Sequence, residues 1–339
     1  MATIYDVAKA VGVSHTAVSA VLNDRPTRVS AATRQRVLEA AELLGYRTNR
    51  AAQQLATGRF NTIALCFERP WDGRFLHPIA NRLIAGVGDW ASEHGLFLLF
   101  APNTPDQEFE QTVSSLSMHG VDGAIVIGSV SLTESTISAI DRNTIPLVCV
   151  DSYPNFVSAG TVDQDNRAGM RTGVEHLIAN GHRRMAYLGA AAVYQCLADR
   201  MAGFREAILN SGLSIDEQTT HVIPCEDVES VVTRALESPN RPTAIVSGEE
   251  RITMALLYTV EKLGLRIPQD ISVLSYGDPA LPHALADSIS VIRNVPYDMG
   301  KTAGELLKKM IDGACPEPVA IRLPPELVLR ACTTTRKPC

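Results

Sequence analysis

The chain has 339 residues, of which 45% are hydrophobic, enough apolar sequence to bury a core in each of two domains. Its formal net charge is -6, a value that by itself disfavours binding to nucleic acid. The seven cysteines form no C-x-x-C pair and the first residues form no basic and apolar leader, which excludes a disulfide-rich secreted protein, a zinc module and a membrane protein. We therefore expect a cytoplasmic protein that makes no membrane contact, with reduced thiols such as Cys66 and Cys149 buried in apolar runs.

The charge is unevenly distributed along the chain. Residues 1–60 carry eight Lys and Arg residues and four Asp and Glu residues, a net charge of +4, which leaves -10 for the remainder. Because neutralisation of phosphates supplies most of the non-specific affinity for DNA, a basic first segment indicates a nucleic-acid partner for that segment alone.

Residues 3–45 have the pattern of three short helices. Thr3 followed by Asp6 is typical of a capping box, and Ser14 and Ser30 are in position to cap the second and third helices, with Gly45 as the final left-handed cap. The expected buried side chains are Ile4, Val7, Ala8 and Val11 in the first helix, Ala17, Val18 and Val21 in the second, and Val37, Leu38, Ala41 and Leu44 in the third. A turn at Gly12-Val13-Ser14 separates the first two helices.

The second expected helix, residues 15–22, directs His15, Thr16, Ser19 and Ala20 outward. A helix-turn-helix places its second helix in the major groove, so these residues are candidate contacts to base edges. The spacing alone equally fits any three-helix unit with glycine in its turn, and the net charge of +4 favours DNA binding.

Residues 47–58 are different in character. Ala51, Ala52, Leu55 and Ala56 have helical spacing, but so few apolar side chains cannot hold a helix against a core. We expect this segment to form a helix only when something binds it.

From residue 61 onward, short β-rich runs alternate with amphipathic helices. The runs are 62–67, 96–101, 122–128, 146–151, 184–190, 243–248 and 271–277, and the helices include 78–94, 166–180, 200–211, 249–263 and 296–311. Nearly continuous apolar strands that alternate with helices predict doubly wound α/β architecture, a parallel sheet covered on both faces. Ligands in this architecture bind beyond the carboxyl ends of the strands.

Ordered motifs along nearly the whole chain resemble those of the lactose-repressor (LacI) family of bacterial transcription regulators. They include Thr3-Ile4-Tyr5-Asp6-Val7-Ala8, Gly12-Val13-Ser14, Val21-Leu22-Asn23, Leu44-Gly45-Tyr46, Asn49-Arg50-Ala51-Ala52-Gln53-Gln54-Leu55-Ala56, Asp165-Asn166-Arg167-Ala168-Gly169, Gly181-His182-Arg183-Arg184 and Pro268-Gln269-Asp270-Ile271. The resemblance implies an all-α helix-turn-helix domain (1–46), a hinge helix and linker (47–60), and a two-subdomain, periplasmic-binding-protein-like (type I) effector domain (61–339). The expected subdomains are 61–161 with 290–320, and 162–289 with 321–339.

The resemblance also implies a set of DNA contacts. They are Thr3, Tyr5, Ser14, His15, Thr16, Ser19, Ala20, Asn23, Asn49, Ala52, Gln53 and Leu55. Leu55 is expected to wedge between base steps in the minor groove, which an apolar side chain on a coreless helix can do; alternatively it packs on the effector domain as a linker residue. Ala20 stands where the family usually has a long polar side chain, so operator sequences of better-known members do not transfer to this chain.

For the effector, the implied contacts fall on Phe75, Arg200, Glu249 and Asp278. The Arg200 guanidinium offers a fork of donors to ligand oxygens, or it forms a structural ion pair. Phe75 either stacks on a ligand ring or fills core, and Glu249 either binds hydroxyls or a cationic group or is a solvated acid favoured by a helix dipole. Two departures from the family pattern, Glu249-Glu250 for Asn-Asp and Gly277 for the first of two aspartates, separate this site from the usual sugar site.

The sequence lacks the patterns of an enzyme. Met299-Gly300-Lys301-Thr302 resembles the end of a P-loop, but the required first glycine is Val295, and neither an H-E-x-x-H nor a G-x-S-x-G motif is present. The interpretation is a homodimeric repressor that binds double-stranded operator DNA and a small-molecule effector, without a cofactor or metal. The alternative is a solute-binding protein of the same α/β architecture, which the basic first 60 residues and the absent leader disfavour.

Overall fold

The computed structural model of the protein describes residues 2–22, 29–46, 58–67, 78–101, 109–128, 134–142, 144–151, 158–190, 195–279, 289–315 and 319–330. Internal contacts divide the chain into two units, Met1–Phe60 and Asn61–Cys339. Each unit has its own hydrophobic core.

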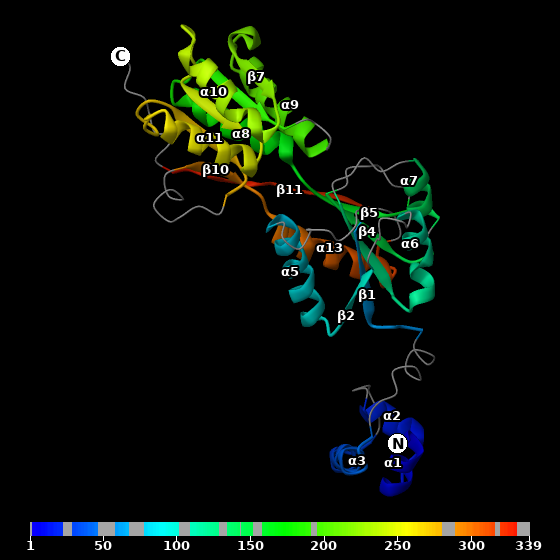
Figure 1. Cartoon of the computed structure of the whole chain (residues 1–339). Helices are drawn as coiled ribbons and strands as arrows, with labels where there is room; N and C mark the ends of the chain where they lie inside the picture. The colour runs from blue at the N-terminus through cyan, green and yellow to red at the C-terminus, as the bar shows by residue number, and fades with distance from the viewer. Residues whose placement is uncertain are drawn as a thin grey trace. The chain divides into compact units, whose positions relative to one another are not determined.

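The first unit consists of the helices α1 (Ile4–Val11), α2 (His15–Leu22) and α3 (Ala31–Leu43), shown in blue in Figure 1. Its core contains Val7, Ala8, Val11, Val18, Val21, Val37 and Ala41. The expectation that Leu38 and Leu44 also belong to this core is wrong, because their side chains are 43% and 42% exposed. A helix of this length in a three-helix unit meets its neighbours along one narrow stripe, and Val37 and Ala41 occupy that stripe.

The second unit contains two six-stranded sheets. The first sheet has the order β11-β5-β4-β3-β1-β2 and is parallel throughout. Its strands are β1 (Thr62–Phe67), β2 (Phe97–Ala101), β3 (Gly123–Ile127), β4 (Leu147–Val150), β5 (Gly160–Gln164) and β11 (Ala320–Leu323). The second sheet has the order β12-β10-β9-β8-β6-β7, in which only β12 is antiparallel to its neighbour. Its strands are β6 (Met185–Gly189), β7 (Thr219–Val222), β8 (Ala244–Ser247), β9 (Ser272–Tyr276), β10 (Ser290–Arg293) and β12 (Glu326–Val328).

Helices cover both faces of each sheet, as the continuous apolar strands predict. On the first sheet, α5 (Pro78–Glu93) and α13 (Pro296–Ile311) cover one face, and α6 (Phe109–Ser115), the 3-10 helix η2 (Leu116–His119) and α7 (Glu134–Asp141) cover the other (Figure 1). On the second sheet, α8 (Asn166–Ala179) and α9 (Gln195–Asn210) pack on one face, and α10 (Val228–Glu237) and α11 (Glu250–Lys262) on the other. The doubly wound prediction is therefore confirmed.

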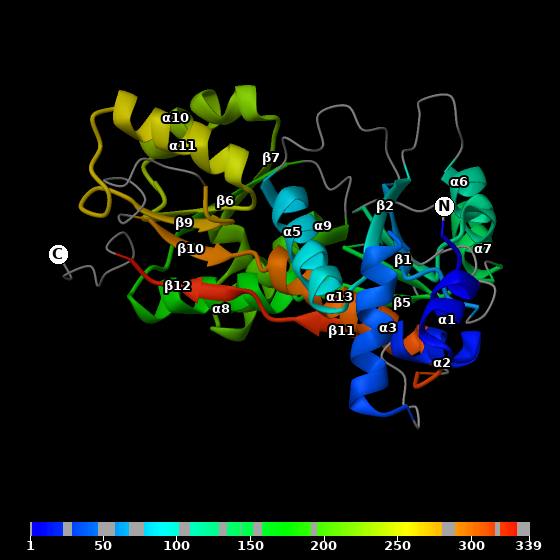
Figure 2. The same ribbon diagram turned by 90° about the horizontal axis from the view of Figure 1, so that it is seen from below.

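The chain crosses between the two sheets three times. It passes from β5 to α8, from β10 to α13, and from β11 to β12; Figure 2 shows β11 and β12 end to end across the two sheets. The crossovers lie a few residues after the expected subdomain boundaries at 161/162, 289/290 and 320/321. Boundaries at 161/162 and 320/321 would cut through β5 and β11, which pair with each other along the whole length of β11. A boundary at 289/290 would assign β10 to the first subdomain, although β10 pairs with β9 in the second sheet.

Strand β2 differs from the expectation of a buried run. It has only β1 as a neighbour, and Phe97, Leu99 and Phe100 are 50%, 38% and 40% exposed. An apolar edge strand of this kind is a site at which other protein surface can pack.

Cys66, Cys149 and Cys196 are reduced and buried, as expected for the first two. Within the described part of the chain, no helix combines the length and the apolar character that crossing a bilayer requires.

Candidate functional site

Local capping sets where α1 and α2 begin and where α1 ends. The hydroxyl oxygen of Thr3 accepts a hydrogen bond from the backbone N–H of Asp6 at 3.4 Å, and the Asp6 carboxylate accepts one from the backbone N–H of Thr3 at 2.8 Å. The hydrogen bonds that the Asp6 carboxylate accepts from the backbone N–H and the hydroxyl group of Thr3 lower the pKa of Asp6. Gly12 ends α1 with a φ of 74°, and the Ser14 hydroxyl accepts the backbone N–H of Ala17 at 3.1 Å. Each predicted cap is confirmed, and the two helices are held at a fixed separation along the chain.

The four side chains that the sequence predicts to face outward on α2 are exposed to different degrees. His15 and Thr16 are exposed, whereas Ser19 and Ala20 are half-buried. Tyr5, on α1, is 65% exposed, and its ring lies 5.1 Å from the His15 ring between centroids. Tyr5, His15 and Thr16 therefore present side chains to solvent at one end of α2, where a helix-turn-helix meets base edges.

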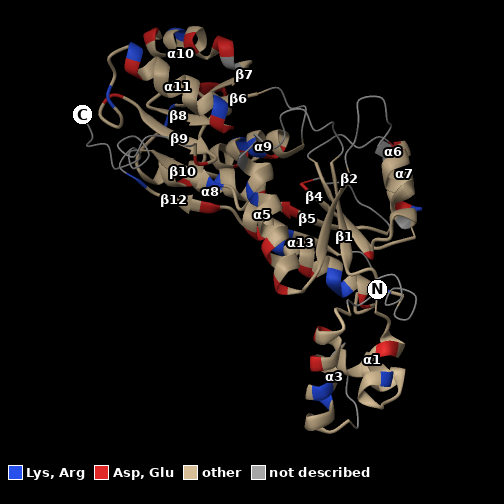
Figure 3. Cartoon of the chain, turned by 60° about the horizontal axis from the view of Figure 1, so that its bottom comes forward, with Lys and Arg blue, Asp and Glu red and all other residues tan. Residues whose placement is uncertain are grey.

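Charged residues of the first unit are segregated along α3. Arg34 and Arg36 lie in its first half and Glu39 and Glu42 in its second half, as the blue and red segments of α3 show (Figure 3). The Arg36 guanidinium donates a hydrogen bond to the backbone oxygen of Val11 at 3.1 Å, which ties α3 to the end of α1. The expected DNA contacts Asn23, Asn49, Ala52, Gln53 and Leu55 lie outside the described residues.

In the second unit, Arg200 is buried and organises a polar site beside the carboxyl ends of the strands. Its side chain is on α9 and is only 9% exposed. The guanidinium donates from Nε to Oδ1 of Asn166 at 2.8 Å and from Nη1 to the backbone oxygen of Gly248 at 2.9 Å. Its Cζ lies 3.9 Å from the centroid of the Tyr276 ring, a cation–π contact. A guanidinium carries five N–H donors, more than these protein groups take.

Asp151 follows β4 directly and approaches Arg200 from the first sheet. Burial raises the pKa of its carboxyl group to about 7, the Arg200 charge lowers it, and Asp163 raises it further. The backbone at Asp151 has a φ of 57°, a conformation that non-glycine residues seldom adopt and that occurs often at ligand sites. A carboxyl group with this pKa carries a proton for part of the population at neutral pH, so that it can donate as well as accept a hydrogen bond.

Three further groups share the surroundings of Arg200. Burial raises the pKa of the Tyr187 and Tyr276 hydroxyls to about 12 each and that of the Cys196 thiol to about 11, and the Arg200 charge lowers all three. These groups are therefore neutral at physiological pH, and they surround the charge of Arg200 without competing with it.

Glu249 is the residue directly before α11 (Glu250–Lys262), and its side chain makes no capping hydrogen bond. Its side chain is 18% exposed, and Oε1 is buried without a hydrogen-bond partner, 3.5 Å from Nη2 of the exposed Arg251. It raises the pKa of Tyr187, which places its charge near the Arg200 cluster. A mostly buried carboxylate oxygen with no hydrogen bond is an acceptor available to a ligand.

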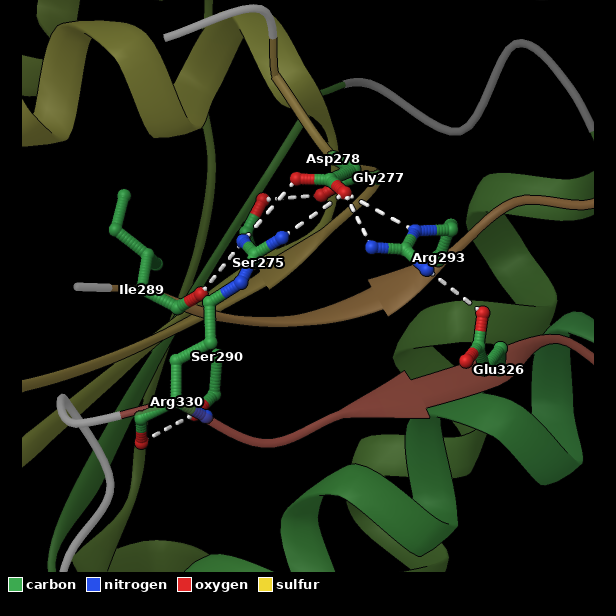
Figure 4. Close-up of polar contacts among 8 residues, drawn as sticks. All are labelled: Ser275, Gly277, Asp278, Ile289, Ser290, Arg293, Glu326 and Arg330. Carbon is green, nitrogen blue, oxygen red and sulfur yellow. Dashed lines mark hydrogen bonds and ion pairs between the residues drawn. The ribbon is translucent and has the colours of Figure 1, made fainter. Parts of the chain in front are cut away.

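Asp278 was expected to contact the effector, but the structure gives its carboxylate a different role. Oδ2 accepts hydrogen bonds from Nε and Nη2 of Arg293 at 3.0 and 2.9 Å, and Arg330 donates to both oxygens at 3.2 Å (Figure 4). Arg293 also donates to Glu326 at 2.8 Å. These ion pairs lower the pKa of Asp278, against its partial burial. The carboxylate therefore joins the end of β9 to β10 and β12, and the expected effector contact of Asp278 stays a prediction.

Several residues of the Arg200 cluster were not among the sequence-predicted contacts: Asp151, Asn166, Tyr187, Cys196 and Tyr276. Two of them carried a usable signal, because Asp151 is the polar last residue of the apolar run 146–151 and Asn166 follows the strand-like segment before α8. Phe75 lies outside the described residues. Among the residues that the structure describes, no group of His, Cys, Asp and Glu side chains is arranged to hold a metal ion.

Comparisons with known proteins match both units. Residues 3–49 match the family described as "Bacterial regulatory proteins, lacI family", and residues 174–333 match the "Periplasmic binding protein-like domain". The chain is 28% identical over 342 residues to the HTH-type transcriptional repressor PurR of Aliivibrio fischeri (strain ATCC 700601 / ES114), and this match covers 99% of each chain. It is also 28% identical to the HTH-type transcriptional regulator CelR of Thermobifida fusca, with 97% of each chain covered.

Solved structures give the same result. The transcriptional regulator CelR–cellobiose complex matches with a TM-score of 0.68 and 26% identity, covering 98% of this chain and 100% of that one. The Lac repressor dimer bound to operator and the anti-inducer ONPF matches with a TM-score of 0.77 and 24% identity, covering 98% and 99%. At 24% identity, the likeness to the Lac repressor structure is evidence of a common fold alone.

Proposed function

Since the chain belongs to the lacI family of bacterial regulatory proteins, we propose that it is a repressor that binds a pseudo-palindromic operator as a homodimer under the control of a small effector. It is a DNA-binding transcriptional regulator and not an enzyme. Its place of action is the cytoplasm, on the nucleoid, where operator DNA is found.

The observation that carries this proposal is the exposed start of α2 on a capped three-helix unit. His15 and Thr16 are exposed at the first turn of the helix, and the shared core of Val7, Val11, Val18 and Val21 packs α1 against α2. Such a helix end fits the major groove, where side chains distinguish base pairs by their donors and acceptors. Two copies related by a two-fold axis would read inverted half-sites.

Leu55 supplies the second DNA contact in this proposal. Its role rests on the sequence, because a leucine on a helical pattern with no core to join can insert between base steps of the minor groove. In this proposal each protomer of the dimer contributes one Leu55 wedge, so the wedges also link operator binding to the spacing of the two protomers.

The proposed effector site is the polar cluster around Arg200. Arg200 belongs to the second subdomain through α9 and Asp151 to the first through β4, so a ligand between them contacts both. The donors of Arg200, the carboxyl group of Asp151 and the Glu249 oxygen that has no hydrogen-bond partner suit a small molecule with several hydroxyl or carbonyl oxygens: a sugar, a sugar derivative or a nucleoside-like metabolite. Binding would change the angle between the subdomains and thereby operator affinity, a coupling between two sites.

The proposed dimer uses the exposed edge of the first sheet. Phe97, Leu99 and Phe100 are exposed apolar side chains on the edge strand β2, and the β2 edge of a second copy would cover them in an isologous contact.

The test is genome-wide mapping of DNA bound by the full-length protein in its host, repeated with Leu55→Ala and Arg200→Ala. We expect wild-type binding at a few inverted-repeat sites, loss of those sites with Leu55→Ala, and retained sites that no longer respond to metabolic state with Arg200→Ala. If the purified full-length protein bound no DNA fragment of its own genome at low salt, with or without candidate metabolites, the proposal would be refuted.

A further inference from the structure

Tyr5 and His15 form an aromatic pair on the solvent face of the first unit. Their ring centroids are 5.1 Å apart and the rings are inclined by 39°, within the range of favourable aromatic contacts. Tyr5 lies on α1 and His15 is the first residue of α2, so the pair spans the turn between the two helices.

The backbones that carry the two rings are fixed independently of the pair itself. The Thr3–Asp6 capping box holds the start of α1 next to Tyr5, and the Ser14 cap holds the start of α2 next to His15. Val7, Ala8 and Val18, on the inner sides of the same helices, are buried in the shared core. The ring of Tyr5 consequently lies against one side of the His15 side chain, and this contact restricts the rotation of both rings.

An imidazole distinguishes bases better when a neighbouring ring limits its rotation. Rotation about its χ2 is broad and roughly two-fold, so that an unsupported exposed ring samples several directions. Its two nitrogens are directional: in the neutral ring one donates and the other accepts a hydrogen bond. A nitrogen aimed at a single base edge therefore discriminates between bases only when the ring plane is held.

We propose that Tyr5 is a positioning residue for DNA specificity: its ring fixes the plane of the His15 imidazole, and His15 reads one base pair in each half-site. This inference rests on the proposed function and adds to it the residue that sets the readout at the first position of α2. The contribution of Tyr5 to base preference comes from its ring and not from its hydroxyl group, and it acts through His15, beside any contact that Tyr5 itself makes with the DNA.

The experiment selects preferred sequences from randomised inverted half-sites with full-length protein. It compares the wild type with Tyr5→Phe, Tyr5→Ala, His15→Ala and the double variant, and uses Thr16→Ala as the matched control on the same exposed turn. Because Tyr5 is 65% exposed and lies outside the core, its truncation leaves the fold intact, which thermal unfolding verifies.

We expect Tyr5→Phe to retain the wild-type preference at every position. Tyr5→Ala should lose discrimination at the same base pair as His15→Ala, by about 3- to 10-fold, the range expected for one aromatic pair. The double variant should lose no more than His15→Ala alone. Thr16→Ala should alter a different base pair and combine additively with Tyr5→Ala.

Other results overturn the proposal. If Tyr5→Phe and Tyr5→Ala both weaken binding to all sequences equally, Tyr5 contributes through its hydroxyl group to sequence-independent backbone contacts and not to base preference. If Tyr5→Ala changes preference equally in the presence and absence of His15, it reads a base itself. If the wild type selects no sequence, the proposed function fails together with this inference.

Discussion

Replacement of Asp151 by asparagine should stabilise the protein, and more so as the pH rises. The pKa of Asp151 is 3.8 in its ordinary state and about 7 in the folded protein, because burial outweighs the attraction of Arg200. Between these pH values the unfolded chain releases a proton that the folded chain keeps, so unfolding becomes easier as the pH increases. A shift of about 3 units at 1.36 kcal/mol each corresponds to about 4 kcal/mol as an upper limit at pH 8.

Asparagine cannot ionise, so Asp151→Asn removes this cost. The advantage of the variant over the wild type should be small below pH 4, grow between pH 4 and 7, and level off above pH 7. Urea unfolding followed by tryptophan fluorescence measures the free energy of unfolding of the second unit alone. Both tryptophans, Trp71 and Trp90, belong to that unit.

Asp270 provides a control of opposite sign. Hydrogen bonds and the charge of Arg266 lower the pKa of Asp270, so its carboxylate stabilises the fold at neutral pH and this contribution is lost as the pH falls. Asp270→Asn should therefore differ from the wild type most at neutral pH, as a loss of stability. An Asp151→Asn advantage that is independent of pH, or largest in acid, would show that Asp151 is ionised in the folded protein and refute the reasoning.

Two further predictions concern the site and its support. Arg200→Lys should lose the effector response as fully as Arg200→Ala, while operator affinity is kept. An ammonium group cannot reproduce the planar guanidinium that donates to both Asn166 and Gly248. A retained response in a reporter strain would contradict this prediction. Gly86→Ala should destabilise the second unit by about 1–3 kcal/mol, because its Cβ would lie 2.1 Å from the Tyr297 carbonyl oxygen, whereas Gly88→Ala, with open space on the same helix, should be neutral or stabilising by up to about 1 kcal/mol. Equal urea midpoints for the two variants would show that α5 and α13 are not packed this closely.

The features that sequence predicts well here are those set by neighbouring residues. The caps at Thr3, Ser14 and Ser30 depend on residues three positions away, and the run 62–67 is apolar enough to be recognised as a strand without knowledge of its partners. Doubly wound architecture follows from many such runs in order.

The features that sequence does not predict depend on distant partners. The role of Asp278 is set by Arg293 and Arg330, which are 15 and 52 residues away, and nothing around Asp278 indicates them. The short strand β12 is recognisable only through its pairing with β10, and the exposure of β2 follows from its place at the sheet edge. Asp151 and Arg200 meet because two sheets approach each other, which no local pattern encodes.

The two departures from the family pattern in the effector unit meet in space. Gly277 has a φ of 92°, and a Cβ at this position would lie 2.3 Å from Cγ of Glu250. Glu250 is held there by the backbone N–H of Asp278, and burial raises the pKa of its carboxyl group. The longer acidic side chain thus occupies the volume that a side chain at position 277 would need, which makes the two substitutions interdependent.

A double-mutant cycle measures this dependence. Gly277→Ala alone should destabilise the unit by about 1–3 kcal/mol from backbone strain and by about 1–3 kcal/mol more from the clash with Glu250. In a Glu250→Ala background the clash is absent and only the strain remains, so the cost of Gly277→Ala should fall by the second amount, as measured by urea unfolding. If the cost is the same in both backgrounds, the Glu250 side chain does not occupy this space, and positions 250 and 277 are not coupled.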